Sequence, residues 1–392
     1  MYDKLWSKDF IFITIVNFLM YLIHYALIVS ITVFTIEKYN ASESMGGLAA
    51  GIFIIGMLFG RLFAGRIIDN MQPKNVLLGG ILFSIVTVAF YFAIHSLIIL
   101  MIVRLLHGVA FGLSSTATGT MSSRIIPENR KGEGIGYYAL SVTVASAIGP
   151  FAGIIINQNL GYQGNFLLCL IVILLAFVVA LSIKKLPLSK PSTDKTCPSG
   201  IQAYVQKEAL PIAMVAALVG IAYSSVLSFM TVFTAKIDLA AASSFFFIVY
   251  AVSTFVTRPI TGKIFDQYGE NKIMYPVLVS FIIGLITLGM TNGSIVLFIS
   301  AIFIGIGYGT VIPSAQAIAI QQSPKEKIGL ATSTFYMFAD LGAGIGPFIL
   351  GFIIPFIGYR YLYIVMGLLV IVSLCVYYFV HGKKASQQQY NT

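Results

Sequence analysis

Long apolar runs, separated by short polar turns, follow one another along almost the whole chain. A helix needs about 20 mostly apolar residues to cross about 30 Å of hydrocarbon, and the runs here have that length. The strands of a membrane barrel would instead alternate polar and apolar residues. We therefore predict an all-α integral membrane protein. Its twelve transmembrane helices are expected at residues 9–36, 44–68, 75–95, 97–122, 132–158, 163–185, 208–236, 240–266, 273–291, 294–320, 328–354 and 359–381.

A shift of 197 positions, the separation of Asp69 and Asp266, superposes the chain on itself without a gap. It also brings Gly149-Pro150-Phe151 onto Gly346-Pro347-Phe348. The same offset aligns both the loops and the apolar segments, which indicates a duplicated unit. We expect two homologous six-helix bundles, 1–185 and 208–392, joined by a polar cytoplasmic linker at 186–207. Because each bundle has an even number of helices, both bundles enter the membrane in the same orientation. They are then related by a pseudo-two-fold axis along the membrane normal.

The composition agrees with lipid as the main solvent, because 58% of the residues are hydrophobic and only 10% are charged. The net charge of +10 has a topological cause, since Lys and Arg gather at every second turn. This positive-inside pattern predicts a cell-membrane protein with both termini in the cytoplasm. It gives no reason to expect nucleic acid as a partner.

Two related loops close the turns after the second and the eighth predicted helices. They read Gly65-Arg66-Ile67-Ile68-Asp69, followed by Lys74, and Gly262-Lys263-Ile264-Phe265-Asp266. Glycine permits a close helix crossing, and the carboxylate can meet a neighbouring helix N-terminus or a basic residue. The loops resemble the cytoplasmic signature loop of the major facilitator superfamily, and the resemblance extends over essentially the whole chain. Gln72 departs from it, because glycine is usual at that position.

The resemblance implies two bundles with a substrate site between them and a cytoplasmic gate that releases during transport. The alternative is a basic loop that only sets topology. The expected gate residues are Gly65, Asp69, Lys74, Arg61, Gly262, Asp266 and Arg258.

The fourth predicted helix contains Arg104 followed by His107 and Gly108. This resembles the fourth-helix motif of the same family, with His107 in place of the usual glutamine. In proton-coupled relatives this arginine is tied to the proton step. An arginine within hydrocarbon is costly unless it faces a cavity or a partner. The alternative for Arg104 is a side chain that extends to the membrane surface.

Three titratable residues fall near the middle of the membrane: His24, His107 and Asp340. Asp340 is the only carboxylate well inside any predicted span. Buried carboxyl and imidazole groups can titrate near neutrality, as a proton-coupled carrier requires. We predict proton coupling by Asp340, Arg104, His24 and His107. A structural hydrogen bond beside Tyr336 is the alternative for Asp340, and ordinary packing is the alternative for the histidines.

The fifth and eleventh helices carry a glycine–proline pattern that resembles the interface motif of the family's exporters. It comprises Gly149, Pro150, Gly153, Gly346 and Pro347. Proline bends a helix and glycine allows close packing. The pattern favours export over uptake, with a generic packing kink as the alternative.

By analogy with the family, the first, fourth, seventh and tenth helices line the substrate cavity. Candidate lining residues are Asn17, Tyr21, Tyr25, Tyr223, Ser228, Tyr308, Gln316 and Tyr336. Such a lining suits a mid-sized amphiphilic molecule, although each of these residues could instead make ordinary helix contacts. There is no phosphate loop, nucleophile elbow or metal-binding spacing, so we expect no enzyme activity, no metal and no cofactor.

Together these features predict a monomeric secondary transporter that exports a small drug-like molecule or metabolite in exchange for protons. Two alternatives stay open at this point. One is a proton symporter that imports a small nutrient, and the other is a non-transporting membrane sensor or scaffold with the same fold.

Overall fold

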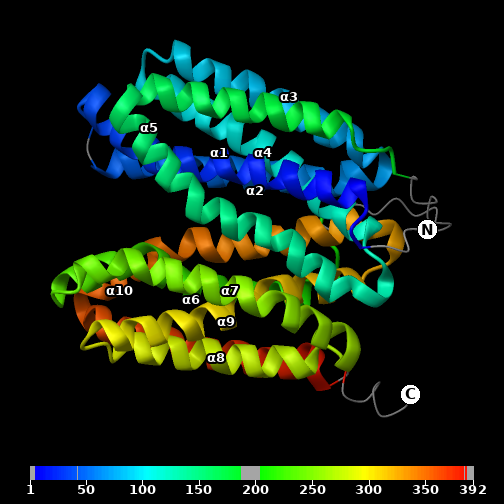
Figure 1. The fold of residues 1–392 in the computed structure, drawn as a ribbon, viewed down its shortest axis with the longest axis vertical. Helices are drawn as coiled ribbons and strands as arrows, with labels where there is room; N and C mark the ends of the chain where they lie inside the picture. The colour runs from blue at the N-terminus through cyan, green and yellow to red at the C-terminus, as the bar shows by residue number, and fades with distance from the viewer. Residues whose placement is uncertain (1–4, 42, 187–203, 384, 386–392) are drawn as a thin grey trace. The chain divides into compact units, whose positions relative to one another are not determined.

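The computed structural model describes residues 5–41, 43–186, 204–383 and 385, and most of the predicted linker at 186–207 lies outside this part of the chain. The described backbone is almost entirely helical and contains no strand. Its elements are α1 (Lys8–Tyr39), α2 (Glu43–Asn70), α3 (Pro73–Phe90), η1 (Tyr91–Ala93), α4 (Leu97–Ile125), η2 (Glu128–Arg130), α5 (Lys131–Leu181), α6 (Leu210–Lys236), α7 (Ala240–Tyr268), α8 (Asn271–Gly289), α9 (Ser294–Gln321), η4 (Lys325–Lys327), α10 (Ile328–Tyr377) and η5 (Tyr378–Gly382) (Figure 1).

Two of the elements, α5 and α10, each contain two successive helices. The break lies at Gly161 in α5 and at Gly358 in α10, where φ is 68° and 74°. These angles belong to the left-handed region, which glycine adopts without steric cost. The two glycines are 197 positions apart, so the repeat extends to the backbone breaks. Counted in this way, the described residues form the twelve predicted helices.

The helices expose large apolar side chains, as a membrane-spanning protein requires. Ile98, Ile295 and Phe356 are 73%, 76% and 88% exposed. Eleven described segments are long and apolar enough to cross a membrane. The first helix of α10 is not among them, and it carries a polar run at 332–334 and Asp340. The chain is therefore a multi-pass membrane protein.

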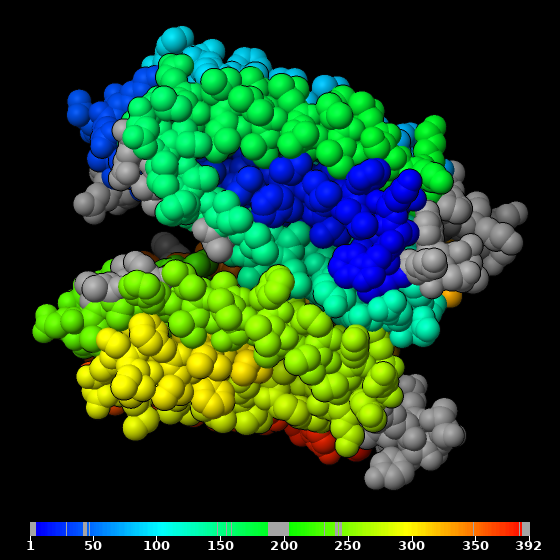
Figure 2. Space-filling view, viewed as in Figure 1, coloured from blue at the N-terminus to red at the C-terminus, as the bar shows by residue number. Residues whose placement is uncertain are grey.

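The chain divides into two compact units. The first comprises Met1–Pro127, Ser141–Gln206 and Pro324–Thr334. Here α4 packs against both α2 and α3, and α1 packs against α2 and α4. A Cβ atom at Gly112 would lie 2.4 Å from the backbone oxygen of Met57, so glycine lets α2 and α4 touch through their backbones. Figure 2 shows α1 (blue) beside the later part of α5 (green) on one face of this unit.

The second unit comprises Glu128–Leu140, Lys207–Ser323 and Phe335–Thr392. In it α9 packs against both α7 and α8. These three helices correspond to α4, α2 and α3 of the first unit, so the repeated sequence produces a repeated packing. The predicted bundle boundaries at 185 and 208 stay predictions.

Candidate functional site

The first of two repeated carboxylate contacts is made by Asp69, at the end of α2. Its Oδ1 accepts hydrogen bonds from the backbone amide of Gly329 (2.9 Å) and from Nη2 of Arg124 (3.0 Å). Its Oδ2 accepts from the amide of Leu330 (2.9 Å). These amides begin α10, where backbone donors have no partner within the helix and the helix dipole favours an anion. We call Asp69, Arg124, Gly329 and Leu330 the first carboxylate cap.

Asp266, at the end of α7, makes the equivalent contact in the second unit. It accepts from the backbone amides of Gly132 (2.7 Å) and Glu133 (2.9 Å), which begin α5. Each of these three residues is offset by 197 positions from its counterpart in the first carboxylate cap. We call this trio the second carboxylate cap. The sequence expectation that both carboxylates can meet a helix N-terminus agrees with this geometry.

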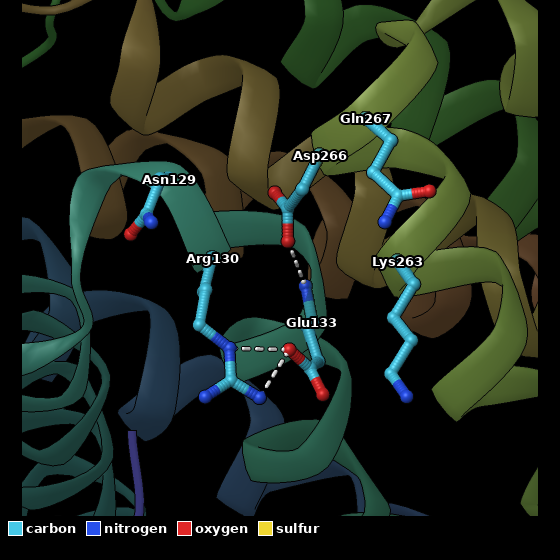
Figure 3. Close-up of a pocket in the computed structure, with 6 residues that line it drawn as sticks. All are labelled: Asn129, Arg130, Glu133, Lys263, Asp266 and Gln267. Carbon is cyan, nitrogen blue, oxygen red and sulfur yellow. Dashed lines mark hydrogen bonds and ion pairs between the residues drawn. The ribbon is translucent and has the colours of Figure 1, made fainter. Parts of the chain in front are cut away.

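Charged side chains surround the second carboxylate cap and line an open hollow of about 280 Å³. Arg130 turns toward Glu133, and its Nε lies 2.6 Å from Oε2 of that carboxylate (Figure 3). Acidic and basic groups are balanced here, so the hollow has no excess charge to attract an ion. Its lining residues are Asn129, Arg130, Glu133, Lys263, Asp266 and Gln267.

Glycine allows the helices at both caps to approach closely. A Cβ atom at Gly65 would lie 2.6 Å from Cβ of Ser333. One at Gly262 would lie 2.6 Å from Cα of Glu133. The Ser333 hydroxyl also donates to the backbone oxygen of Arg61. Both predicted loop glycines therefore stand where another residue would push the capped helix away.

Two basic residues of the predicted gate, Arg258 and Lys74, donate to backbone carbonyls. Arg258 is 7% exposed, and its Nε donates to the carbonyl of Gly309 at 3.1 Å. Nζ of Lys74 donates to the carbonyl of Leu181 at 2.8 Å. Arg61 is 1% exposed. Lys74 therefore caps the end of α5, and Arg258 supports the packing of α7 against α9.

A buried polar cluster lies inside the first unit. Nη1 of Arg104 lies 3.5 Å from the hydroxyl of Tyr91, which lies 3.2 Å from Nδ1 of His107. The three side chains are at most 3% exposed. Nε and Nη2 of Arg104 donate to the carbonyls of Ala49 (3.0 Å) and Ala50 (3.3 Å) in α2. We call Arg104, Tyr91 and His107 the Arg104 cluster.

The Arg104 cluster buries a cation inside the first unit, so the side chain of Arg104 does not extend to the surface of that unit. Its Cζ lies 4.7 Å from the ring centroid of Phe53, a distance at which a ring attracts a cation. The sequence did not point to Tyr91. Comparison of the two repeats could have identified it. The positions equivalent to Tyr91, Arg104 and His107 in the second unit are all apolar: Leu288, Ala301 and Ile304. The polar cluster is therefore specific to the first unit.

The other two predicted coupling residues lie outside the Arg104 cluster. The ring of His24 stacks on Phe53 at 4.7 Å and lies 5.3 Å from Phe111. Nδ1 of His24 has no hydrogen-bond partner among the described residues. Asp340 lies on α10 in the second unit and is half-buried. The coupling roles of all four residues stay predictions.

The predicted lining residues of the first unit lie along α1. Nδ2 of Asn17 donates to Ser141 at 2.8 Å, and its Oδ1 accepts from Thr118 at 3.1 Å. Asn17 is fully buried and so ties α1 to two other helices. Tyr21 and Tyr25 are half-buried, with ring centroids 6.2 Å apart.

In the second unit the predicted lining residues form pairs. Tyr223 and Tyr308 stack face to face with ring centroids 3.7 Å apart. Nε2 of Gln316 donates to the hydroxyl of Tyr336 at 3.0 Å. Ser228 is exposed. A lining role stays a prediction for all of them.

The glycine–proline pattern packs within each unit. A Cβ atom at Gly149 would lie 2.6 Å from Cβ of Tyr25, so α5 presses against α1. One at Gly346 would lie 2.0 Å from Oγ of Ser224, so α10 presses against α6. Pro150 and Pro347 lie inside these helices. Among the described residues, no group of three His, Cys, Asp or Glu is placed to hold a metal ion.

Comparison with known proteins extends over nearly the whole chain. The staphylopine export protein of Staphylococcus aureus is 24% identical over 355 residues, which cover 86% of this chain and 87% of that protein. The multidrug resistance protein MdtG of Dickeya zeae is 21% identical over 347 residues, 86% of this chain and 85% of that protein.

Two solved structures share the fold. The outward-conformation structure of the transporter FucP has a TM-score of 0.79 at 14% identity and covers 96% of this chain and 99% of that one. The human organic anion transporter MFSD10 (TETRAN) has a TM-score of 0.76 at 12% identity, with 94% and 98% covered. The model of the Major Facilitator Superfamily matches residues 13–296 and 238–391. With its twelve helices and repeated units, this chain belongs to the Major Facilitator Superfamily of membrane transporters.

Proposed function

We propose that this chain exports a small amphiphilic molecule from the cytoplasm in exchange for protons. It would act as a monomer in the cell membrane, with both termini in the cytoplasm and no cofactor beyond the proton gradient. Relatives named for the export of staphylopine and for multidrug resistance support the outward direction, and they align over more than four fifths of the chain.

The pair of carboxylate caps is the observation that carries an alternating-access mechanism. Each cap joins the end of a helix from one sequence repeat to the start of a helix from the other. Such bonds are strong when made, because the acceptor is charged, and they can break without covalent change. Release of Asp69 and Asp266 would open the cytoplasmic side, and their return would close it.

Proton coupling is supported by the titratable groups in the membrane interior. Asp340 would take up and release the proton, and His24 and the Arg104 cluster would respond to the changed charge. A carboxyl group in this position changes the local charge by one unit for each proton, which alters the relative stability of the two access states. The substrate and the proton would then alternate on the carrier.

The test begins with a thermal-shift screen of amphiphilic compounds, because a specific ligand stabilises the folded protein by mass action. The best ligand is then studied in proteoliposomes under opposite pH gradients. We expect it to accumulate on the side from which protons leave. We also expect Asp340→Asn to abolish this accumulation and leave the protein folded.

Three results would contradict the proposal. Accumulation on the side that protons enter would indicate an importing symporter. A ligand that binds without any proton movement would indicate a sensor or scaffold. Full pH-driven transport by the Asp340→Asn variant would remove Asp340 from the mechanism.

A further inference from the structure

Four aromatic rings follow one another through the second unit, each in contact with the next. Tyr250 of α7 lies 5.7 Å from Tyr223 of α6, centroid to centroid, at 28°. Tyr223 lies 3.7 Å from Tyr308 of α9 at 8°. Tyr308 lies 5.8 Å from Phe281 of α8 at 50°. We call these four residues the aromatic ladder.

The central pair of the aromatic ladder has an unfavourable geometry. Aromatic pairs prefer an offset or edge-to-face arrangement with centroids about 4.5–7 Å apart, because the negative faces of two rings repel each other. Tyr223 and Tyr308 are instead nearly parallel at 3.7 Å. A flat ring inserted between them would replace this one face-to-face contact with two ring contacts, each of which can take the preferred offset geometry.

The fold does not require this arrangement. The equivalent positions in the first unit hold Ala26 and Ser84 in place of Tyr223 and Phe281. The same helix packing therefore forms without a ladder. Phe281 is fully buried and holds one end, whereas Tyr223, Tyr250 and Tyr308 are half-buried, so part of each of these rings is accessible.

A cation lies beside the aromatic ladder. The guanidinium of Arg258 donates to the carbonyl of Gly309, the residue that follows Tyr308. Arg258 is 7% exposed, and a buried charge is weakly screened. It repels a cationic ligand and attracts an anionic one. Arg258 therefore selects the charge of the ligand, and the tyrosine pair selects its flat shape.

We propose that Tyr223 and Tyr308 move apart and bind a flat aromatic ring of a neutral or anionic substrate between them, and that these two residues determine the specificity of transport. This inference rests on the proposed export function and adds the substrate class to it. Ring contact requires about 3.5–4 Å on each face, so the two tyrosines move apart to about 7–8 Å when the substrate enters.

The test measures binding to the purified full chain by calorimetry, with three probes of similar size. Naphthalene-2-carboxylate is flat and anionic, decahydronaphthalene-2-carboxylate is anionic and puckered, and 2-naphthylmethylammonium is flat and cationic. We expect the first to bind about ten-fold more tightly than the puckered acid, because each stacked ring contact adds to the apolar contribution to binding. We expect the same difference from the flat cation, because the buried charge of Arg258 repels a cationic ligand.

Variants locate the site. Tyr308→Leu and Tyr223→Leu should each lose about ten-fold in affinity for naphthalene-2-carboxylate, whereas Tyr308→Phe keeps the ring and the affinity. Tyr359→Leu is the matched control, because Tyr359 is also half-buried in the second unit but packs on Phe229 and Phe233. Its affinity should equal that of the wild type.

Equal affinities of the wild type for the flat and the puckered acid would overturn the inference, and this comparison needs no variant to fold. Unchanged binding by both folded leucine variants would also overturn it. Proton-driven transport of another compound without selectivity for flat acids would leave the export function intact. Selective binding of the flat acid without proton-driven transport would remove the export function alone.

Discussion

The two units share their carboxylate caps and differ in the membrane interior. Asp69 and Asp266 accept the same pair of backbone amides, offset by 197 positions. The interior of the first unit contains the Arg104 cluster, whereas that of the second contains the aromatic ladder. The carboxylate caps occur in both units, as expected for a gate that opens and closes in both. The Arg104 cluster and the aromatic ladder each occur in one unit only, as expected for specialised roles such as the proposed proton coupling and substrate recognition.

The caps themselves differ in charge. Arg124 forms an ion pair with Asp69 at 3.0 Å, with side chains 9% and 13% exposed. The position equivalent to Arg124 in the second unit holds Gln321, which cannot form an ion pair. Both caps thus have one backbone geometry, but only the first adds a largely buried ion pair. The first cap should therefore resist opening more strongly.

The largest effect is expected when the two carboxylates are neutralised. Asp69→Asn leaves Arg124 without its ion-pair partner and should lower the free energy of unfolding by about 3 kcal/mol. Asp266→Asn weakens two charge-assisted hydrogen bonds and should cost about 1 kcal/mol. The apparent Tm in detergent and the transport rate in proteoliposomes measure both. Equal losses in the two variants would remove the distinction between the caps.

The next effect is expected at Arg124. Arg124→Gln gives the first cap the residue found in the second, and should cost about 2 kcal/mol because Asp69 keeps only its backbone donors. The reciprocal control is Gln321→Arg, an exposed position where a new ion pair should add less than about 1 kcal/mol. Apparent Tm values of the two variants serve as the readout. A Tm for Arg124→Gln at the wild-type value would contradict the account.

A smaller loss is expected inside the first unit. Tyr91→Phe deprives Arg104 and His107 of their shared hydroxyl, and should cost about 1.5 kcal/mol. The matched control is Tyr363→Phe, because Tyr363 is fully buried and its hydroxyl has no hydrogen-bond partner among the described residues. Thermal unfolding should show a loss for Tyr91→Phe alone. The same loss in both variants would indicate a general cost of removing a buried hydroxyl.

The smallest effect concerns a contact found only in the second unit. Nε2 of His381 lies 2.9 Å from Oε1 of Glu270, and this hydrogen bond lowers the pKa of Glu270 below its ordinary value of 4.5. The contact therefore adds stability above pH 4.5, and this stability is lost as the pH falls through the lower pKa of the folded protein. Apparent Tm values of the wild type and Glu270→Gln should converge in that acid range. A difference that persists below it would contradict the assignment.

The helices were predictable from the sequence because the length of each apolar segment and the glycines between segments are local features of the chain. The breaks at Gly161 and Gly358 fall between predicted spans for this reason. The contacts of both carboxylates were also predictable, since Asp69 and Asp266 recur in the same short loop pattern. Tyr91 was missed because it lies in η1, directly after α3, and only tertiary packing brings its hydroxyl to Arg104. The stacking of Tyr223 on Tyr308 likewise depends on how the helices are rotated, which periodicity does not specify.

The central claim is that substrate and proton compete for the carrier, and the number of protons released on binding tests it most directly. Calorimetry of the ligand from the thermal-shift screen, in two buffers of different ionisation enthalpy, gives this number for the purified chain. The account predicts proton release from the wild type and none from Asp340→Asn, with binding retained in both. Proton uptake on binding, or binding to the wild type with no proton exchange at any pH tested, would contradict it.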